Sequence, residues 1–168
     1  MIFRPGEPGF RFHDTVFVYM HLDENPMPGQ LPPDDDCFAI RQAARYVSQL
    51  YDRHLGKAGL KITQYSIMNR IRRKPGITMK ELADGMVMER TTLVRAIQPL
   101  QRDGLVRGDV SEMDHRALKM HLTPAGLARL ETASDHWYAA QDEFEQRFGK
   151  ERAEALRQEL FALTKKRN

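Results

Sequence analysis

The residues best suited to recognition chemistry lie in one short run near the middle of the chain. From Glu89 to Gln98 the sequence reads Glu-Arg-Thr-Thr-Leu-Val-Arg-Ala-Ile-Gln. An arginine can donate two hydrogen bonds to guanine, and a threonine can contact a phosphate or a thymine methyl group. The run therefore provides a set of candidate DNA contacts: Arg90, Thr91, Thr92, Arg95 and Gln98. An ordinary surface helix that carries arginines is the alternative that this run leaves open.

A short capped helix is predicted just before this run. Residues Thr78–Glu81 form a capping box, in which the Thr78 side chain accepts a hydrogen bond from the Glu81 amide and the Glu81 carboxylate reaches back. We expect the helix to continue through Asp84 and to stop at Gly85.

The run itself begins a second helix, expected over residues 89–102. Its apolar positions Leu93, Ile97 and Leu100 are spaced by four and three, which puts them on one face. A short helix, a turn with glycine and a longer helix make a helix-turn-helix pattern, whose second helix enters a DNA groove. Pro99 removes one backbone amide, so we expect a bend or a loosened hydrogen-bond ladder there.

Further elements are predicted on both sides from apolar periodicity, helix caps and Gly or Pro breakers. They are helices over 36–55 and 64–73, strands over 105–107 and 118–122 around a polar turn, and helices over 124–148 and 150–165. The first helix carries an apolar stripe of helical period: Ile40, Ala44, Val47, Tyr51 and Leu55.

Charge is concentrated in the same middle part of the 168-residue chain. Residues 61–119 hold 12 basic and 7 acidic side chains, although the whole chain has a net charge of only +3. Like charge gathered on one segment suits a polyanionic partner, and a solvated helical surface is the alternative. Residues 1–35 are acidic and contain six of the nine prolines, which predicts a flexible arm without its own core.

The sequence offers no basis for catalysis or for a metal or cofactor site. No nucleophile–base–acid set, phosphate-binding loop or HExxH motif is present, and the six histidines lack metal-ligand spacing. A single cysteine excludes a site built on several thiolates. The longest apolar run, residues 15–20, is too short to span a membrane, and no signal peptide is visible. We therefore expect a cytoplasmic protein that is not an enzyme.

Motifs downstream of the second helix carry a family resemblance. They are Gly104-Leu105-Val106, Asp114-His115-Arg116 and Leu122-Thr123-Pro124-Ala125-Gly126. Together with Glu81-Leu82-Ala83, they resemble the winged helix-turn-helix repressors of the MarR family, over roughly residues 37–165. The resemblance implies a mainly helical fold with a small β-hairpin wing, made of a DNA-binding lobe over 61–123 and dimerisation helices over 36–58 and 124–168.

The same resemblance implies a partner and a role for the wing. A symmetric homodimer would bind a pseudo-palindromic operator in double-stranded DNA, with half-sites about one helical turn apart. Arg116 would enter the minor groove and Asp114 would orient it. A surface ion pair that stabilises the turn is the alternative interpretation of these two residues.

An effector is also implied, because repressors of this family usually release DNA when a compound binds or oxidises them. Candidate lining residues for a small aromatic or acidic ligand are Arg41, Arg45, His54 and Tyr65, in a pocket between the first, second and fifth helices and the lobe. Arg41 and Arg45 are equally compatible with being surface or dimer-interface residues that have no part in ligand binding.

Two alternatives to a ligand-released repressor follow from other residues. Cys37 at a helix start resembles the cysteine of organic-hydroperoxide sensors, and Tyr51 matches one tyrosine that hydrogen-bonds it. Arg41 and Ile62 stand where two further tyrosines of that set would be, which weakens a redox role. The other alternative is a winged-helix protein–protein adaptor that does not bind DNA.

Overall fold

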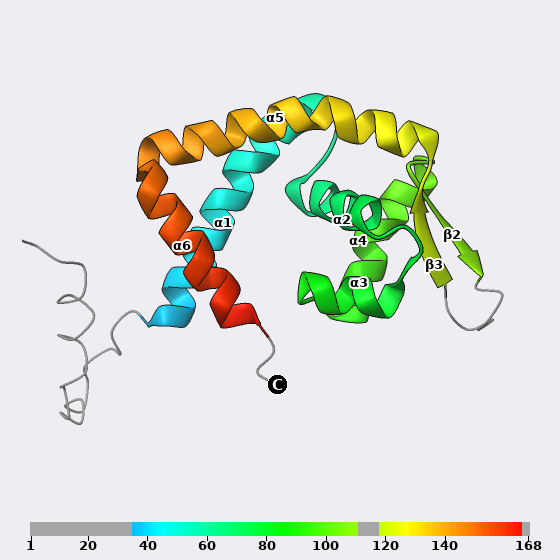
Figure 1. Ribbon diagram of the computed structural model, residues 1–168, viewed down its shortest axis with the longest axis horizontal. Helices are drawn as coiled ribbons and strands as arrows, with labels where there is room; N and C mark the ends of the chain where they lie inside the picture. Colours follow the sequence, from blue (N-terminus) through cyan, green and yellow to red (C-terminus); the bar gives the residue numbers. More distant parts are fainter. Residues whose placement is uncertain (1–34, 111–117, 166–168) are drawn as a thin grey trace, which may run out of the picture. The chain divides into compact units, whose positions relative to one another are not determined.

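The computed structural model describes residues 35–110 and 118–165 as a mainly helical fold with a small antiparallel sheet (Figure 1). The helices are α1 (Asp36–Leu55), η2 (Gly56–Ala58), α2 (Ile62–Arg73), α3 (Met79–Met86), α4 (Arg90–Arg102), α5 (Pro124–Phe148) and α6 (Lys150–Thr164). The strands are β1 (Ile77–Thr78), β2 (Val106–Val110) and β3 (Leu118–Leu122), in the order β1-β3-β2. This architecture confirms the predicted fold class.

The contacts divide the chain into Met1–Phe38 and Ala39–Asn168, and the packing described below belongs to the second unit. Residues 1–34 of the predicted arm lie outside the described residues. Within 35–110 and 118–165, no helix is long and apolar enough to cross a membrane.

The helix-turn-helix differs from prediction at its turn. Gly85 does not end the first helix, because α3 continues to Met86 and Val87 takes the left-handed C-cap conformation at φ 52°. The expectation of a stop at Gly85 was therefore wrong. The second helix continues through Pro99 to Arg102 as α4.

Other element boundaries moved by a few residues. The helix α2 begins at Ile62 rather than Gln64, and β2 extends to Val110 beyond the predicted end at Arg107. The two-residue strand β1 was not predicted, since its only support is pairing with β3.

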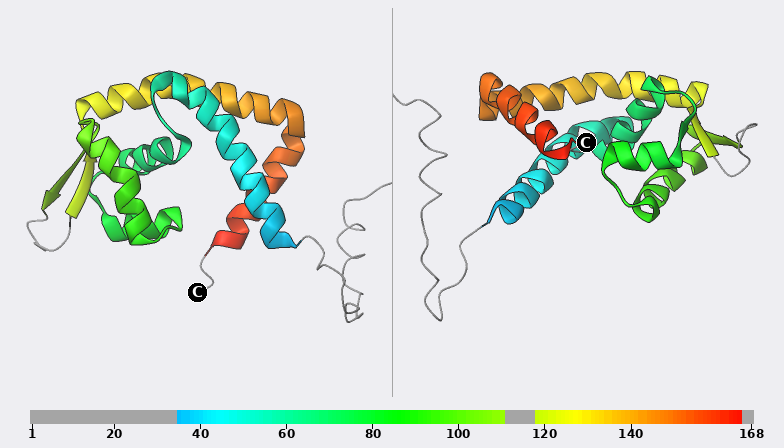
Figure 2. Two further views of the ribbon diagram at one scale, coloured as in Figure 1. Left: turned by 180° about the vertical axis from the view of Figure 1, so that it is seen from behind. Right: turned by 60° about the horizontal axis from the view of Figure 1, so that its bottom comes forward.

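The core joins the lobe to the long helix α5. Buried side chains of α2, α3 and α4 pack around Ile67, Met68, Leu82 and Leu93. Figures 1 and 2 show α5 running from the wing strands, past α2, to the turn that leads into α6. An aromatic cluster ties α5 to α1 and α2, with the Tyr51 and Tyr65 rings each 6.3 Å from that of Trp137.

The apolar stripe of α1 is buried over only part of its length. Tyr51 and Leu55 belong to the core, whereas Ile40 is 43% exposed. Within the unit Ala39–Asn168, the N-terminal part of this stripe therefore leaves apolar side chains exposed to solvent.

Candidate nucleic-acid interface

The helix α4 is held by one apolar face and leaves the opposite face to solvent. Leu93, Ile97 and Leu100 are buried, as their spacing predicts. All five of the candidate DNA-contact side chains are exposed: Arg90, Thr91, Thr92, Arg95 and Gln98. The lobe thus presents a row of hydrogen-bond donors on a helix whose other side is fixed.

The capping box fixes the start of α3. The Glu81 amide donates to Thr78 Oγ1 at 3.2 Å, and the Thr78 amide donates to Glu81 Oε2 at 2.9 Å. Lys74 Nζ, at the end of α2, donates to Glu81 Oε1 at 2.6 Å. The hydrogen bonds that the Glu81 carboxylate accepts from Lys74 and Thr78, that from Lys74 first, lower the pKa of Glu81 to about 2. The carboxylate therefore connects the end of α2 to the helix that supports α4.

The turn between α3 and α4 depends on an unusual residue. Val87 is 73% exposed and adopts a positive φ, although β-branched residues rarely do so. Its amide donates to the carbonyls of Ala83 and Asp84, and the Met88 amide donates to Ala83 O at 3.0 Å. These hydrogen bonds close the end of α3 and direct the chain into α4.

Several cations of the lobe are available to a polyanion. Among the described residues, neither Arg90 nor Arg95 forms an ion pair. Arg72 and Arg73 are exposed at the end of α2. By contrast, Arg102 Nε lies 3.5 Å from Asp103 Oδ1. The free cations therefore include those of the first half of α4, where groove contacts are expected.

The wing strands pair in a single register. Residues 106–110 of β2 face residues 122–118 of β3, and Arg107 forms an ion pair with Asp109 at 2.5 Å. Asp114 and Arg116, predicted for the wing tip, lie outside the described residues.

The predicted effector residues lie in different environments. Arg41 and Arg45 are exposed on α1. His54 Nε2 lies 2.6 Å from Glu143 Oε2, whereas the buried Tyr65 ring stacks on Trp137 at an interplanar angle of 15°. His54 thus belongs to a polar network and Tyr65 to the aromatic cluster.

That polar network was missed by sequence reasoning. Glu143 on α5 also binds Arg53 and Arg147 at 2.7 Å, and Arg147 donates to Tyr46 Oη at 3.0 Å. The hydrogen bonds from His54 and Arg53, that from His54 first, and the charge of Arg147 lower the pKa of Glu143. A lone glutamate about 90 residues from its α1 partners gives no local signal of this role.

The two residues of the redox alternative differ in environment. Cys37 is exposed in the first turn of α1. Tyr51 is buried, and its hydroxyl donates a short hydrogen bond to Gln141 Oε1. Burial raises the pKa of the Tyr51 phenol, which Arg157 partly offsets. No group of three or more possible metal ligands lies within the part of the chain that the structure describes.

Comparison with known proteins identifies the family. Residues 58–117 match the MarR family. The crystal structure of the M. tuberculosis transcriptional regulator MosR in complex with DNA is similar at a TM-score of 0.70 and 36% identity, over 78% of this chain and 94% of that one. The chain belongs to the MarR family. It is thus a member of a family of non-enzymatic, DNA-binding transcriptional regulators.

Two curated relatives are less identical in sequence to this chain, and they match over a smaller part of their length. A putative transcriptional regulatory protein for the hcr operon of Thauera aromatica is 32% identical over 98 residues, 56% of this chain. The match spans about half of that relative, 55% of its length. The organic hydroperoxide resistance transcriptional regulator of Bacillus subtilis is 24% identical over 99 residues, 59% of this chain and 67% of that protein.

Proposed function

We propose that this MarR-family chain is a cytoplasmic homodimeric repressor that binds a pseudo-palindromic operator in double-stranded DNA. The observation that carries the proposal is the exposed face of α4. There Arg90 and Arg95 have no acidic partner among the described residues, on a helix held by its buried leucines and isoleucine. Such a face can donate to base edges and phosphates without first breaking an ion pair.

Exposed apolar side chains on α1 and α6 support the homodimer. Ile40 on α1 is exposed, as are Leu156, Leu160 and Leu163 on α6, the last at 69%. The three leucines are spaced by four and three and therefore share one helix face. A second copy would cover these surfaces, which accords with dimerisation through residues 36–58 and 124–168.

The wing completes the proposed interface. Arg116 would enter the minor groove with Asp114 orienting it, and the nearest described residues on either side, Val110 and Leu118, pair across β2 and β3. An arginine there responds to groove width and negative potential more than to base identity.

Fluorescence anisotropy tests DNA binding. Titration with duplex DNA from upstream of the chain's own gene, against unrelated duplex, is expected to give selective binding that weakens with salt. The slope is about −0.9 log unit per log unit of salt for each neutralised phosphate. Arg95→Ala and Arg116→Ala should weaken binding without changing the dimer, whereas Lys150→Ala on α6 is a matched control.

The outcomes of this titration separate the function classes. Equal affinity of Arg95→Ala and wild type would remove α4 from the proposed interface. Absence of binding to any duplex at low salt would favour the protein–protein adaptor. The curves should be recorded with purified dimer, whose mass is checked by light scattering.

Release by a small aromatic or acidic ligand is the regulatory part of the proposal. Arg41, Arg45, His54 and Tyr65 are the residues that the family resemblance suggests for it. Because His54 pairs with Glu143, a ligand carboxylate at this position would compete with an existing acidic partner. Titrating a benzoate series into the protein–DNA complex tests release, and unchanged DNA affinity with every member would count against it.

A redox-sensing repressor is the second candidate, favoured by the exposure of Cys37. Oxidation by a hydroperoxide would require an accessible thiolate, and a helix start favours that form. If Cys37→Ser releases DNA on peroxide treatment as wild type does, the thiol has no part in regulation.

A further inference from the structure

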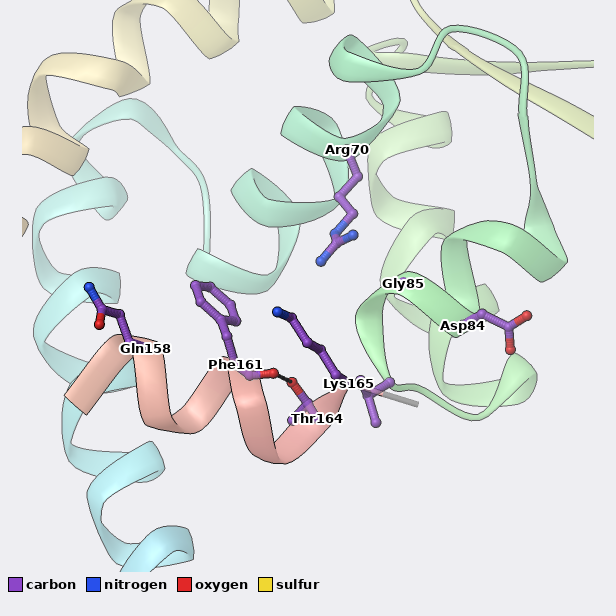
Figure 3. A pocket seen from close by; sticks show the side chains of 8 residues that line it. Arg70, Asp84, Gly85, Gln158, Phe161, Thr164 and Lys165 are labelled. Atoms are coloured by element: carbon purple, nitrogen blue, oxygen red, sulfur yellow. Dashed lines mark hydrogen bonds between the residues drawn. The ribbon is translucent and has the colours of Figure 1, made fainter. Parts of the chain in front are cut away.

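A cavity of about 570 Å³ lies between the C-terminal helix and the helix-turn-helix (Figure 3). Its walls come from the end of α2, from α3 with the turn that follows, and from the last two turns of α6 with the residue after them. None of the four residues suggested above for an effector lines it. The cavity is open to solvent rather than enclosed, so a large partner can reach its lining side chains.

Two cations reach into this cavity from opposite walls. Figure 3 shows the Arg70 guanidinium from α2 and the Lys165 ammonium group from the end of α6 extending into the same space. Among the residues that the structure describes, neither cation has an ion-pair partner. Asp84 is the acidic residue of the lining, and its carboxylate points away from both cations in that view. The described residues thus leave both positive charges available to an anionic partner.

The cavity lies beside the start of the proposed recognition helix. Val87, which lines the cavity, is three residues before Arg90, so their Cα atoms are at most about 11 Å apart. The major groove is about 12 Å wide, with a phosphate backbone along each side. When the first residues of α4 enter that groove, one backbone strand passes close to the turn and hence to the cavity.

The residue types at the cavity suit this backbone. An arginine forms paired hydrogen bonds to two oxygens of one phosphate, whereas a lysine acts as a point charge. Each DNA strand carries one negative charge about every 3.4 Å along the helix axis, so one strand can supply a phosphate to each cation. Lys165 also begins a run of three cations in the sequence, Lys165-Lys166-Arg167. Clustered cations are typical of surfaces that bind polyanions.

A glycine allows Arg70 to reach the cavity along α3. A Cβ atom at Gly85 would lie 2.9 Å from Arg70 Nη1, so the absence of a side chain there lets the guanidinium lie against the helix. Gly85 is in the last turn of α3, and the dipole of a helix favours positive charge at that end. Arg70 therefore has a structural role as well, which its variants must separate from a DNA contact.

The cavity lies on the side of α6 that the proposed dimer does not need. At about 100° per residue, Phe161 and Lys165 are about 140° and 180° around the helix axis from Leu156. Leu160 and Leu163 share the face of Leu156. A partner subunit that covers the leucine face therefore leaves the cavity face open to DNA.

We propose that Arg70 and Lys165 bind the phosphate backbone of operator DNA beside the helix-turn-helix, so that α6 contributes to DNA binding as well as to the dimer. The inference rests on the proposed function, because it adds a contact to the same protein–DNA complex. Arg70 belongs to the DNA-binding lobe and Lys165 follows the C-terminal helix, so a backbone that contacts both fixes the lobe against α6. Phosphates carry no base identity, and the contact therefore adds affinity for any sequence.

Fluorescence anisotropy at several salt concentrations tests the contact, with purified full-length protein, the duplex from upstream of its own gene and an unrelated duplex of equal length. Arg70→Gln and Lys165→Gln should each reduce the slope of log affinity against log salt by about 0.9, for the phosphate that is no longer neutralised. Each should weaken binding about twofold to fivefold, by the same factor on both duplexes. Arg70→Lys and Lys165→Arg keep the charge and should keep the wild-type slope. Lys150→Gln, at the other end of α6, is the matched control and should bind as wild type does.

Ethylation interference locates the contact on the DNA. In wild type, ethylation of the phosphates that these two cations bind should weaken binding. In the Arg70→Gln/Lys165→Gln double variant those positions should lose their effect, whereas phosphates next to the bases that α4 contacts should keep theirs. Urea unfolding shows that each variant is folded, since a cation at the end of a helix contributes only about 0.3–1 kcal/mol.

Three results would overturn the inference. They are wild-type salt slopes in both glutamine variants, a loss of affinity confined to one duplex, and an unchanged ethylation pattern in the double variant. Equal weakening by Arg70→Lys and Arg70→Gln would reduce Arg70 to its structural role against α3 and refute its phosphate contact. Failure of wild type to bind any duplex at low salt would refute the proposed function itself, whereas selective wild-type binding with unaltered variants refutes only the contact at the cavity.

Discussion

Replacing Gly126 with alanine should destabilise the junction between the wing and the long helix. Gly126 lies in the first turn of α5, and a Cβ atom there would lie 2.0 Å from the carbonyl oxygen of Leu105. Reaching an ordinary contact of 3.4 Å requires the two backbones to separate by about 1.4 Å. The obstacle is backbone, so no side-chain rotation relieves it.

That separation breaks hydrogen bonds that hold the same junction. The Thr123 amide donates to Leu105 O at 3.1 Å, and Thr123 Oγ1 donates to Gly104 O at 2.6 Å. Overpacking costs about 1–3 kcal/mol and a lost hydrogen bond about 0.5–1.5 kcal/mol, so we expect a loss of about 2–4 kcal/mol in the free energy of unfolding. Helix propensity alone predicts the opposite effect, an increase of about 0.5–1 kcal/mol in the free energy of unfolding. The sign of the measured change therefore distinguishes the close contact from helix propensity.

Urea unfolding, monitored by far-ultraviolet circular dichroism at one fixed protein concentration, measures the difference in the free energy of unfolding between Gly126→Ala and wild type. Gly56→Ala is the matched control, because nothing lies within 4 Å of a Cβ at that position. The control should be neutral or more stable by up to about 1 kcal/mol. If Gly126→Ala were as stable as wild type, the close approach of α5 to Leu105 would be refuted.

Changes at four further positions test the helix-turn-helix and the core. Thr78→Ala should cost about 1 kcal/mol in urea unfolding through the lost N-cap, and Thr78→Ser should not. Because the pKa of Glu81 is lowered from 4.5 to about 2, the stability that its carboxylate contributes is present above pH 4.5 and is lost as the pH falls towards 2. Melting curves of Glu81→Gln should therefore depend less on pH in that window. Val87→Gly should raise the free energy of unfolding by about 0.5–1 kcal/mol, because relief of the strain at positive φ exceeds the entropy cost of glycine. An unchanged urea midpoint in this variant would show that Val87 is not strained. The raised pKa of Tyr51 favours the neutral phenol in the fold, so stability present below pH 10 is lost at higher pH. Tyr51→Phe should be less stable at pH 7 by about 1 kcal/mol, through the lost bond to Gln141, yet lose less stability on titration above pH 10.

Local interactions let the sequence alone determine much of this protein. Each of the helix caps at Thr78 and Thr123 involves two residues that are three positions apart. Both caps could therefore be predicted from the sequence, and both occur in the structure. The spacing of Leu93, Ile97 and Leu100 likewise determined which face of α4 is buried. The motifs around Gly104 and Thr123 are local in the sequence, and they are sufficient to indicate the family.

Only the tertiary structure decided features that depend on residues distant in the sequence. The strand β1 exists because Ile77 and Thr78 pair with β3, and α3 ends at Val87 rather than at Gly85. The glycine of the family motif is required because Leu105 packs against it from 21 residues away. Arg70 and Lys165 line the same cavity, although they lie 95 residues apart in the sequence. Such contacts are set by packing between elements, and no periodicity or cap along the chain encodes them.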